Sequence, residues 1–324
     1  MIDNIVSSFR TSEVLNLKDP DRNKIYYGFL YNYSSANTRR AYLKELKRFC
    51  IFLKTRFNSI SEFEVEHAHL VAYKEELVSG GGERIEKFSQ SSINRTFACL
   101  FAFYEYLQDQ GIVTKNPVQR IKRFKISKEV KTIDLTDEQV EKLLAIIPTN
   151  TGPGKLHKAV LTLLFTTGMR QAELANLKFK NLDYENEYLV LRYFAKGSTE
   201  MVTPLNQRAI DAIGTYLKWC SECDYSMEQD DYIFRPTINP KSGIINKKLD
   251  GTSLNYMIKK YASLIGIKGN VTVHSARSTV IGMLLEKGHS IDRVADFVGH
   301  KDMGTTKAYN KRKAKIHNSL SFEL

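Results

Sequence analysis

Six cationic, imidazole and hydroxyl side chains in the C-terminal half of the chain together match the needs of phosphodiester cleavage. That reaction requires an in-line nucleophile, cations that stabilise negative charge on the non-bridging oxygens, and a proton for the departing oxygen. Arginine suits the second task because its planar guanidinium bonds two phosphate oxygens at once and stays charged at any working pH. The six candidates are Arg170, Lys196, His274, Arg277, His300 and Tyr309.

None of these residues is informative alone. Arg170 lies three residues before Glu173, so a salt bridge would be its default role. A lone histidine is more often structural than catalytic, and Lys196 beside Gly197 would otherwise be a solvated turn lysine. The chain has 17 tyrosines, and a tyrosine is usually half-buried core. Only the joint pattern favours a shared site.

The joint pattern resembles the active-site motifs of the tyrosine recombinase (phage-integrase) family. The resemblance is carried by Arg-x-x-Glu-Leu at 170–174, His-x-x-Arg at 274–277, and Gly299-His300 with eight residues between His300 and Tyr309. It covers about residues 30–315, more weakly in the N-terminal half. Residues 1–30 are too short for the arm-binding domain of large phage integrases, so a Xer-like enzyme without that domain is expected.

The resemblance implies that the Tyr309 hydroxyl attacks the scissile phosphorus, leaving a 3′-phosphotyrosine and a free 5′-hydroxyl. Arg170 and Arg277 would hold the phosphate. A phenol with a pKa near ~10 is mostly protonated at neutral pH, so a base or strong local positive charge is needed. The resemblance gives the role of base to His274.

Three further roles follow from the same resemblance. His300 is a hydrogen-bond donor to the phosphate, and Lys196 donates a proton to the leaving 5′-oxygen. Glu173 orients an active-site cation from outside the chemical core. Because a phosphotyrosine stores the bond energy, neither ATP nor a metal is required. No cofactor and no metal site are therefore expected, and the sequence has no Walker loop or clustered carboxylates.

The sequence departs from the family pattern where no catalytic group is affected. Ser278 stands directly after the second arginine, where the family often has histidine. Ala172 replaces a frequent serine, and Val298 replaces a common leucine before Gly-His. Activity therefore remains the expectation, whereas a particular subfamily does not follow.

The charge of the chain favours a polyanionic partner. The formal net charge is +12, and lysines and arginines that neutralise phosphates release condensed counterions. An anionic membrane is the rival, but no apolar run approaches the ~20 residues of a spanning helix, and the N-terminus lacks the order of a secretory signal. Basic charge alone does not identify the partner. The resemblance implies double-stranded DNA rather than a membrane, and the expected location is cytoplasmic, associated with the nucleoid.

Four cysteines are too few for a disulfide framework in a chain of 324 residues. Cys220 and Cys223 have Cys-x-x-Cys spacing, yet no second Cys or His pair follows to complete a zinc site. Packing in the core near the end of a helix is the preferred interpretation.

Apolar periodicity predicts three helices in the first half, over residues 35–54, 63–77 and 91–107. One side of the first helix is apolar, with Tyr42, Leu46, Phe49 and Leu53. The other side is basic, with Arg40, Lys44, Lys47 and Arg48. This basic side is either solvated or turned toward DNA. The aromatic residues of 91–107 are expected to be core.

Residues 116–134 are typical of a basic interdomain linker. They contribute Lys122, Arg123 and Lys125 as candidate DNA contacts, although a solvated hinge would have the same composition. The linker ends at Thr136, which forms a capping box with Gln139 at the start of a helix over 137–147.

The second half predicts a mainly helical domain with a small hairpin. Helices are expected over 155–166, 253–265, 274–286 and 291–298, after Asn206 as a cap, and briefly around Arg170 after a turn at Gly168. Runs of β-branched and aromatic residues at 188–194 and 201–203 predict antiparallel strands with Lys196 at their tip.

The expected fold class is mainly α with a small antiparallel β-sheet in the catalytic domain, arranged as a two-domain C-shaped DNA clamp. The predicted parts are an N-terminal extension (1–30), a helical SAM-like core-binding domain (31–115), the linker (116–134), the catalytic domain (135–315) and a tail (316–324).

The resemblance implies a site-specific DNA recombinase that acts in integration, excision or resolution, as a homo-tetramer on two DNA sites. Two alternatives stay open. One is a type IB topoisomerase-like enzyme that reseals the strand it cut, and the other is a non-catalytic accessory DNA-binding protein with the same fold.

Overall fold

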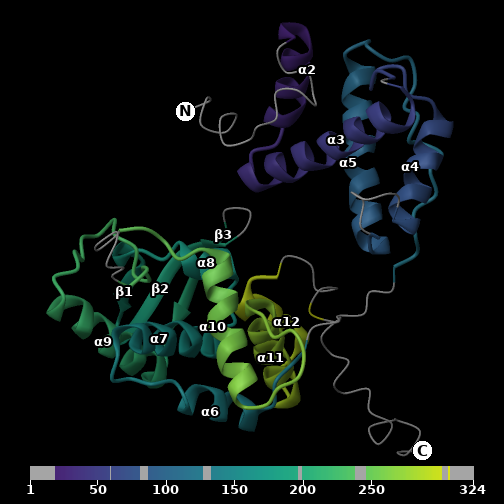
Figure 1. Ribbon diagram of the computed structural model, residues 1–324. Coiled ribbons are helices and arrows are strands. Elements are labelled where there is room, and N and C mark those ends of the chain that lie inside the picture. The colour runs from purple at the N-terminus through teal and green to yellow at the C-terminus, as the bar shows by residue number, and fades with distance from the viewer. Residues whose placement is uncertain are drawn as a thin grey trace, which may run out of the picture. The chain divides into compact units, whose positions relative to one another are not determined.

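The chain forms two compact units, Met1–Ser127 and Lys128–Leu324, in the computed structural model (Figure 1). The structure describes residues 19–58, 60–80, 87–126, 133–195, 199–237, 246–300 and 306. The division between the units falls within the predicted linker 116–134. Each unit has a hydrophobic core of its own.

Unit 1 is helical in its described part, with α2 (Pro20–Tyr31), α3 (Ala36–Arg56), α4 (His67–Ser79) and α5 (Gln90–Asp109). Serine side chains fix the start of two helices, because Ser35 accepts from the N–H of Thr38 and Ser89 from the N–H of Ser92. α4 begins at His67 rather than at residue 63, since Glu66 is its N-cap.

The core of unit 1 is rich in aromatic side chains. The stripes predicted on α3 and α5 are buried, including Phe49 and Phe97. The rings of Tyr26 and Phe103 stack with their centroids 5.5 Å apart. Because Tyr26 and its neighbour Phe29 are buried, α2 belongs to the core, and the segment 1–30 predicted as an extension ends inside this unit.

The chain after α5 stays attached to unit 1 as far as residue 126. Val118 and Ile121 are buried in its core. The Asn94 side chain of α5 binds Phe124 twice, donating to its carbonyl at 2.8 Å and accepting from its N–H at 2.9 Å. The first half of the predicted linker is therefore packed against helices rather than forming a solvated hinge.

Unit 2 combines helices with one three-stranded sheet. Its helices are α6 (Asp137–Ala145), α7 (Gly152–Thr167), α8 (Gln171–Ala175), the 3-10 helix η1 (Phe179–Asn181), α9 (Gln207–Glu222), α10 (Gly251–Leu264), α11 (Val273–Glu286) and α12 (Ile291–Val298). The capping box at the start of α6 is confirmed, because Gln139 N–H donates to Thr136 Oγ1 at 3.2 Å and Thr136 N–H to Gln139 Oε1 at 3.0 Å.

The sheet has the order β1-β2-β3, with both pairs antiparallel. Its strands are β1 (Leu182–Glu185), β2 (Tyr188–Ala195) and β3 (Thr199–Pro204). β2 and β3 form the predicted hairpin, in which Tyr193 pairs with Met201 and Ala195 with Thr199. β1 was not predicted because most of it is exposed and polar, so it lacks an apolar alternation. The fold class, mainly α with a small antiparallel sheet, is confirmed.

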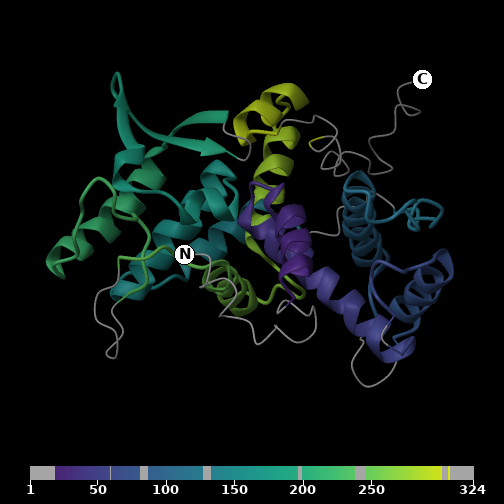
Figure 2. The same cartoon turned by 90° about the horizontal axis from the view of Figure 1, so that it is seen from above.

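In unit 2, helices that lie far apart in the sequence pack against one another. α7 packs against both α9 and α11, and α12 packs against α11 (Figures 1 and 2). Ten of the fourteen residues of α11 are buried as a result. Cys220 of α9 is buried and Cys223 half-buried, both as free thiols, which agrees with core packing. In the described part of the chain, no helix combines the length and apolarity needed to cross a bilayer.

Candidate active site

Arg170 is positioned by the turn that ends α7. Gly168 takes the left-handed conformation there (φ 62°), and Arg170 is the N-cap of α8 rather than a residue within it. Glu173 is largely buried and binds Arg170 twice, accepting from its backbone N–H and from its Nη1, each at 2.8 Å. Arg170 Nη2 donates to the carbonyl of Gly299 at 2.7 Å. Glu173 therefore orients the Arg170 guanidinium.

Arg277 reaches the same place from α11. It is only 3% exposed, and its Nη1 donates to the carbonyl of Gly168 at 2.7 Å. Its Nη2 donates to the carbonyl of Val298 at 2.5 Å. The two guanidiniums thus bind consecutive carbonyls, of Val298 and Gly299, at the end of α12. Helix C-termini carry partial negative charge, which suits two cations in one place.

His300 follows these carbonyls directly. Gly299 ends α12 in the left-handed conformation (φ 65°), and the His300 N–H donates to the carbonyl of Ala295 at 2.9 Å. The His300 Nδ1 is hydrogen-bonded to Oγ1 of the buried Thr306 at 2.8 Å, with the donor set by the tautomer. Thr306 therefore holds the imidazole, and the backbone of His300 directly follows the carbonyls that the two arginines bind.

His274 lies in the first turn of α11, one turn before Arg277. The side chain keeps exposed surface, but the surrounding protein removes part of the water around its ring. This desolvation lowers the pKa of His274 below its usual value, and the positive charge of Arg277 lowers it further. A lowered pKa favours the neutral imidazole, which is the form that accepts a proton.

The β2–β3 hairpin lies next to the arginine pair. The Tyr193 hydroxyl lies 3.4 Å from Thr203 Oγ1, and burial raises the pKa of Tyr193, which also senses the charges of Glu173, Arg277 and Arg170. A Cβ on Gly299 would lie 3.2 Å from Met201 Sδ, so this strand packs closely on the turn before His300. Sequence reasoning missed Tyr193, and the alternation along β2 was its only signal.

The structure therefore brings four of the six predicted residues into one neighbourhood, namely Arg170, His274, Arg277 and His300. Lys196 and Tyr309 lie outside the described residues. Within the described ranges, no three His, Cys, Asp or Glu side chains cluster as metal ligands would.

The predicted basic side of α3 divides into two kinds of cation. Arg40 and Lys44 are exposed, whereas Lys47 and Arg48 are half-buried. Arg48 Nη1 donates to Oε2 of the buried Glu45 at 2.8 Å, and its guanidinium lies 4.3 Å from the centroid of the Phe88 ring. Partial burial lowers the pKa of Lys47. Arg40 and Lys44 are the members of this set best placed to meet a polyanion.

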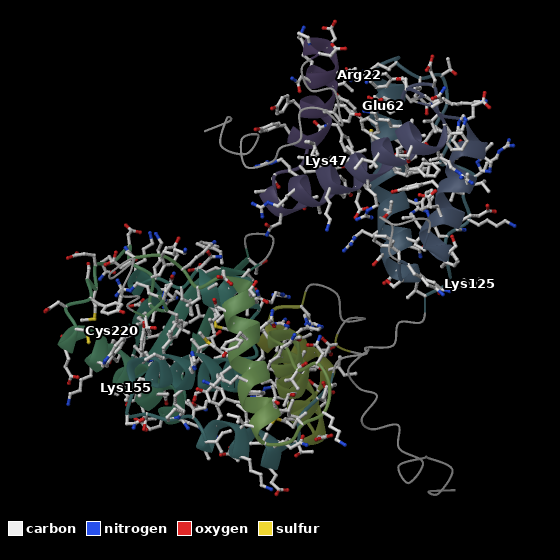
Figure 3. The ribbon with its side chains drawn as sticks, in the orientation of Figure 1. Arg22, Lys47, Glu62, Lys125, Lys155 and Cys220 are labelled. Carbon is white, nitrogen blue, oxygen red and sulfur yellow. The ribbon has the colours of Figure 1, made fainter. Side chains whose placement is uncertain are left out.

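The three candidates from the linker also differ. Lys122 and Lys125 are exposed, and Lys125 lies at the end of unit 1 away from Arg22 (Figure 3). Arg123 instead folds back on α5, where its Nη1 donates to the carbonyl of Asn94 at 2.5 Å and its Nη2 to that of Phe97 at 2.7 Å. Its guanidinium is therefore engaged in fastening this segment to α5.

Known families and proteins resemble both units. Residues 134–315 match the Phage integrase family, and residues 27–111 match the Phage integrase, N-terminal SAM-like domain. A tyrosine recombinase of Pseudothermotoga lettingae is 28% identical over 275 residues, which is 85% of this chain and 87% of the relative. Tyrosine recombinase XerD of Neisseria meningitidis is 30% identical over 220 residues, 68% of this chain and 72% of the relative.

Solved structures share the fold. A XerH site-specific recombinase bound to difH substrate in a pre-cleavage complex superposes with a TM-score of 0.66 at 18% identity, covering 96% of this chain and 92% of that one. A lambda integrase tetramer bound to a Holliday junction gives a TM-score of 0.67 at 18% identity, covering 90% and 77%. At this identity the likeness concerns the fold alone.

The family match spans more than half of the chain, so the chain belongs to the phage integrase family, and it is a site-specific recombinase of the tyrosine class.

Proposed function

We propose that this protein cleaves and rejoins DNA at a specific site through a 3′-phosphotyrosine formed by Tyr309. The observation that carries the proposal is the convergence of Arg170 and Arg277 on consecutive carbonyls immediately before His300. Guanidinium and imidazole groups at one place form a preorganised site for a single anion, and a DNA phosphate supplies that anion.

Each proposed group has one task in the first strand transfer. The Tyr309 oxygen attacks the phosphorus, its proton passes to the neutral His274, and the bond from phosphorus to the 5′-oxygen breaks. Lys196 protonates the departing 5′-oxygen. Arg170, Arg277 and His300 stabilise the charge on the non-bridging oxygens. A second 5′-hydroxyl then attacks the phosphotyrosine, so that the number of phosphodiester bonds is conserved without ATP.

The remaining architecture supports positioning of the two arginines. Glu173 is largely buried and orients Arg170 through two hydrogen bonds. The carbonyl of Gly168 and the end of α12 orient Arg277. Because these partners are fixed before DNA binds, little reorganisation is needed when charge develops on the phosphate.

The assembly that we propose is a homo-tetramer on two DNA sites, which exchanges strands in pairs. The lambda integrase of similar fold is a tetramer bound to a Holliday junction, and the XerH of similar fold is bound to a difH substrate. Double-stranded DNA would be bound with the help of the net charge of +12. A role at a chromosomal or mobile-element site would place the protein in the cytoplasm at the nucleoid.

A covalent-trapping experiment tests this function. DNA fragments bound by the protein in cells would define the site, and a nicked suicide substrate built from that site would let the cut end diffuse away. We expect a covalent adduct with the wild type and none with Tyr309→Phe. The control is Tyr184→Phe, since Tyr184 is an exposed tyrosine of β1.

The outcomes separate the alternatives. An adduct that survives Tyr309→Phe, or that the wild type fails to form, contradicts the proposal, and the second result is expected of an accessory protein. Relaxation of supercoils without joining of two sites is the result expected of a topoisomerase.

A further inference from the structure

Residues 133–135, which precede α6, are hydrogen-bonded to the middle of α11. The Leu135 N–H donates to Oγ1 of Thr279 at 2.9 Å, and both residues are fully buried. The Ser278 hydroxyl donates to Oδ1 of Asp134. Ile133 lies against Gly269, because a Cβ on that glycine would meet Ile133 Cδ1 at 2.4 Å. This segment is thus held by side chains of α11 and by the loop before it.

The Asp134 carboxylate contacts α11 on the helix face that carries His274, the proposed base. Ser278 follows Arg277 directly and stands four residues after His274, so Ser278 and His274 share one face of the helix. The described charged groups that act on the imidazole come from two elements, Arg277 from its own helix and Asp134 from residues 133–135. Their effects are opposite in sign.

We propose that Asp134, held by Ser278, is a positioning residue that orients His274 and stabilises its protonated form next to Arg277 during DNA cleavage. This proposal rests on the proposed function, in which His274 accepts the proton of Tyr309. A histidine that gains a proton beside an arginine faces like-charge repulsion. A carboxylate fixed beside the ring offsets that repulsion, as the buried aspartate does in serine-protease triads.

Ser278 gives the arrangement its geometry. Its side chain is buried, so its hydroxyl has a strong need for a partner, and Asp134 is that partner. Ser278 occupies the position after the second arginine at which related sequences often have histidine. In this chain Ser278 therefore binds the Asp134 carboxylate. This hydrogen bond links residues 133–135 to α11, the helix of His274 and Arg277.

Asp134→Asn is the sharpest variant, because the amide oxygen still accepts from Ser278 while the charge is lost. We expect single-turnover cleavage of the suicide substrate to slow several-fold, because a base of lower pKa takes up the Tyr309 proton less readily. Removal of the carboxylate further lowers the pKa of His274. The acidic limb of the rate profile, where the base becomes protonated, should therefore move to lower pH. A merely structural role would slow cleavage without moving that limb.

Two further variants distinguish the loss of the Asp134 charge from a general folding defect. Ser278→Ala keeps the charge but releases the carboxylate, so the rate should fall while the protein still folds. In a His274→Gln background, Asp134→Asn should have little additional effect, because the pair acts as one unit. Asp137→Asn, at an exposed aspartate in the first turn of α6, is the matched control and should leave both rate and limb unchanged.

The pKa of His274, measured by NMR titration in the full chain, is a readout that does not depend on cleavage. A lower pKa in Asp134→Asn supports the proposal. If the wild type forms an adduct but Asp134→Asn leaves the cleavage rate, the acidic limb and the His274 pKa unchanged, this proposal alone is overturned. If the wild type forms no adduct, the proposed function is overturned and this proposal falls with it.

Discussion

The two arginines of the site differ in burial and in the groups that pair with their guanidinium charges. Arg277 is almost fully buried, and a buried guanidinium is tolerated only if its donors are paired. Its partners are the carbonyls of Gly168 and Val298, at the ends of α7 and α12. The Arg170 side chain is 29% exposed and relies on Glu173. Arg277 is therefore part of the scaffold as well as a candidate phosphate ligand.

Alanine variants of the two arginines should separate these contributions. Each should slow DNA cleavage by roughly 100 to 1,000-fold, as loss of a preorganised donor does. Arg277→Ala should also lower the free energy of unfolding by about 1–3 kcal/mol, because it leaves buried carbonyls unpaired, and Arg170→Ala should lower it less. Trapping assays and urea unfolding measure the two effects. Arg208→Ala, which breaks an exposed pair with Glu141, is the control.

Arg123 tests whether a basic residue of the linker serves DNA or the fold. Since its guanidinium donates to two carbonyls of α5, Arg123→Ala should destabilise unit 1 by about 1–2 kcal/mol and leave the salt dependence of DNA binding almost unchanged. Lys125→Ala, at an exposed side chain, should do the reverse. A reduced salt slope without loss of stability in Arg123→Ala would show that this side chain leaves α5 to bind phosphate.

At the scale of elements, one amide joins the segments that carry the catalytic motifs. The Asn255 Nδ2 donates to the carbonyl of Gly251 at 2.9 Å and, more weakly, to Oε1 of Gln171 at 3.3 Å. Its Oδ1 accepts from the N–H of Val273 at 3.1 Å. Gln171 follows Arg170 and Val273 precedes His274, so α10 fixes the distance between the two motifs.

Gly251→Ala disturbs this joint through a single methyl group. The added Cβ would lie 1.7 Å from Gln171 Nε2, so the Gln171 side chain must move away. We expect cleavage to slow several-fold with little loss of stability, because the obstructing atom ends a flexible side chain. Gly214→Ala is the matched control in α9, where nothing lies within 4 Å of the new Cβ. That change should raise stability by about 0.5–1 kcal/mol and leave cleavage unchanged.

The contact of α7 with α10 should make unit 2 sensitive to acid. His157 Nδ1 is hydrogen-bonded to the Tyr261 hydroxyl at 2.9 Å. Burial, with a smaller effect from Lys260, lowers the pKa of His157 to about 4. The unfolded chain gains this proton near pH ~6.5 and the folded chain does not, so stability is full above that pH and falls toward pH ~4. Partial exposure limits the loss to roughly 1–3 kcal/mol.

Urea unfolding at pH 7 and pH 5 measures this loss, and the fluorescence of Trp219, the one tryptophan of the chain, reports unit 2. His157→Gln should make unit 2 less sensitive to this change of pH, because glutamine does not titrate. An equal loss of stability in wild type and variant would assign the acid sensitivity to other groups.

At the scale of the whole molecule, the net charge of +12 is spread over two units with separate cores. Charges that neutralise phosphates contribute to the salt dependence of binding, whereas charges in ion pairs contribute less. Among the described residues of unit 1, the cations engaged in this second way are Arg22, Lys24, Arg48 and Arg95. DNA affinity should therefore depend on a subset of the exposed cations outside such pairs.

The double variant Arg40→Gln, Lys44→Gln tests this subset. The slope of log K against log salt should decrease in magnitude by about 1.8, since each phosphate contact contributes about 0.9. Fluorescence anisotropy at several salt concentrations measures the slope. The control replaces Lys24 and Lys142 by glutamine, because both are exposed and paired with Asp21 and Glu138. An unchanged slope in the first variant would remove α3 from the DNA interface.

The sequence alone determined most of the elements and the candidates for the site. Caps such as Thr136 and Asn206 and the turn at Gly168 act within a few residues, so local pattern predicted where helices begin and end. The spacing of Tyr309 from Gly299-His300, and of Glu173 from Arg170, likewise involves only a few residues of sequence and was sufficient to select candidates.

Only the tertiary structure decided which distant groups meet. The carbonyl of Gly299 receives Arg170 across 129 residues, and Ser278 meets Asp134 across 144. The Arg123 side chain is a similar case. It donates to carbonyls of Asn94 and Phe97, which are distant in the sequence and are brought near it by packing. Such contacts depend on how α7, α11 and α12 pack, and packing is a property of the complete core that local propensity does not contain.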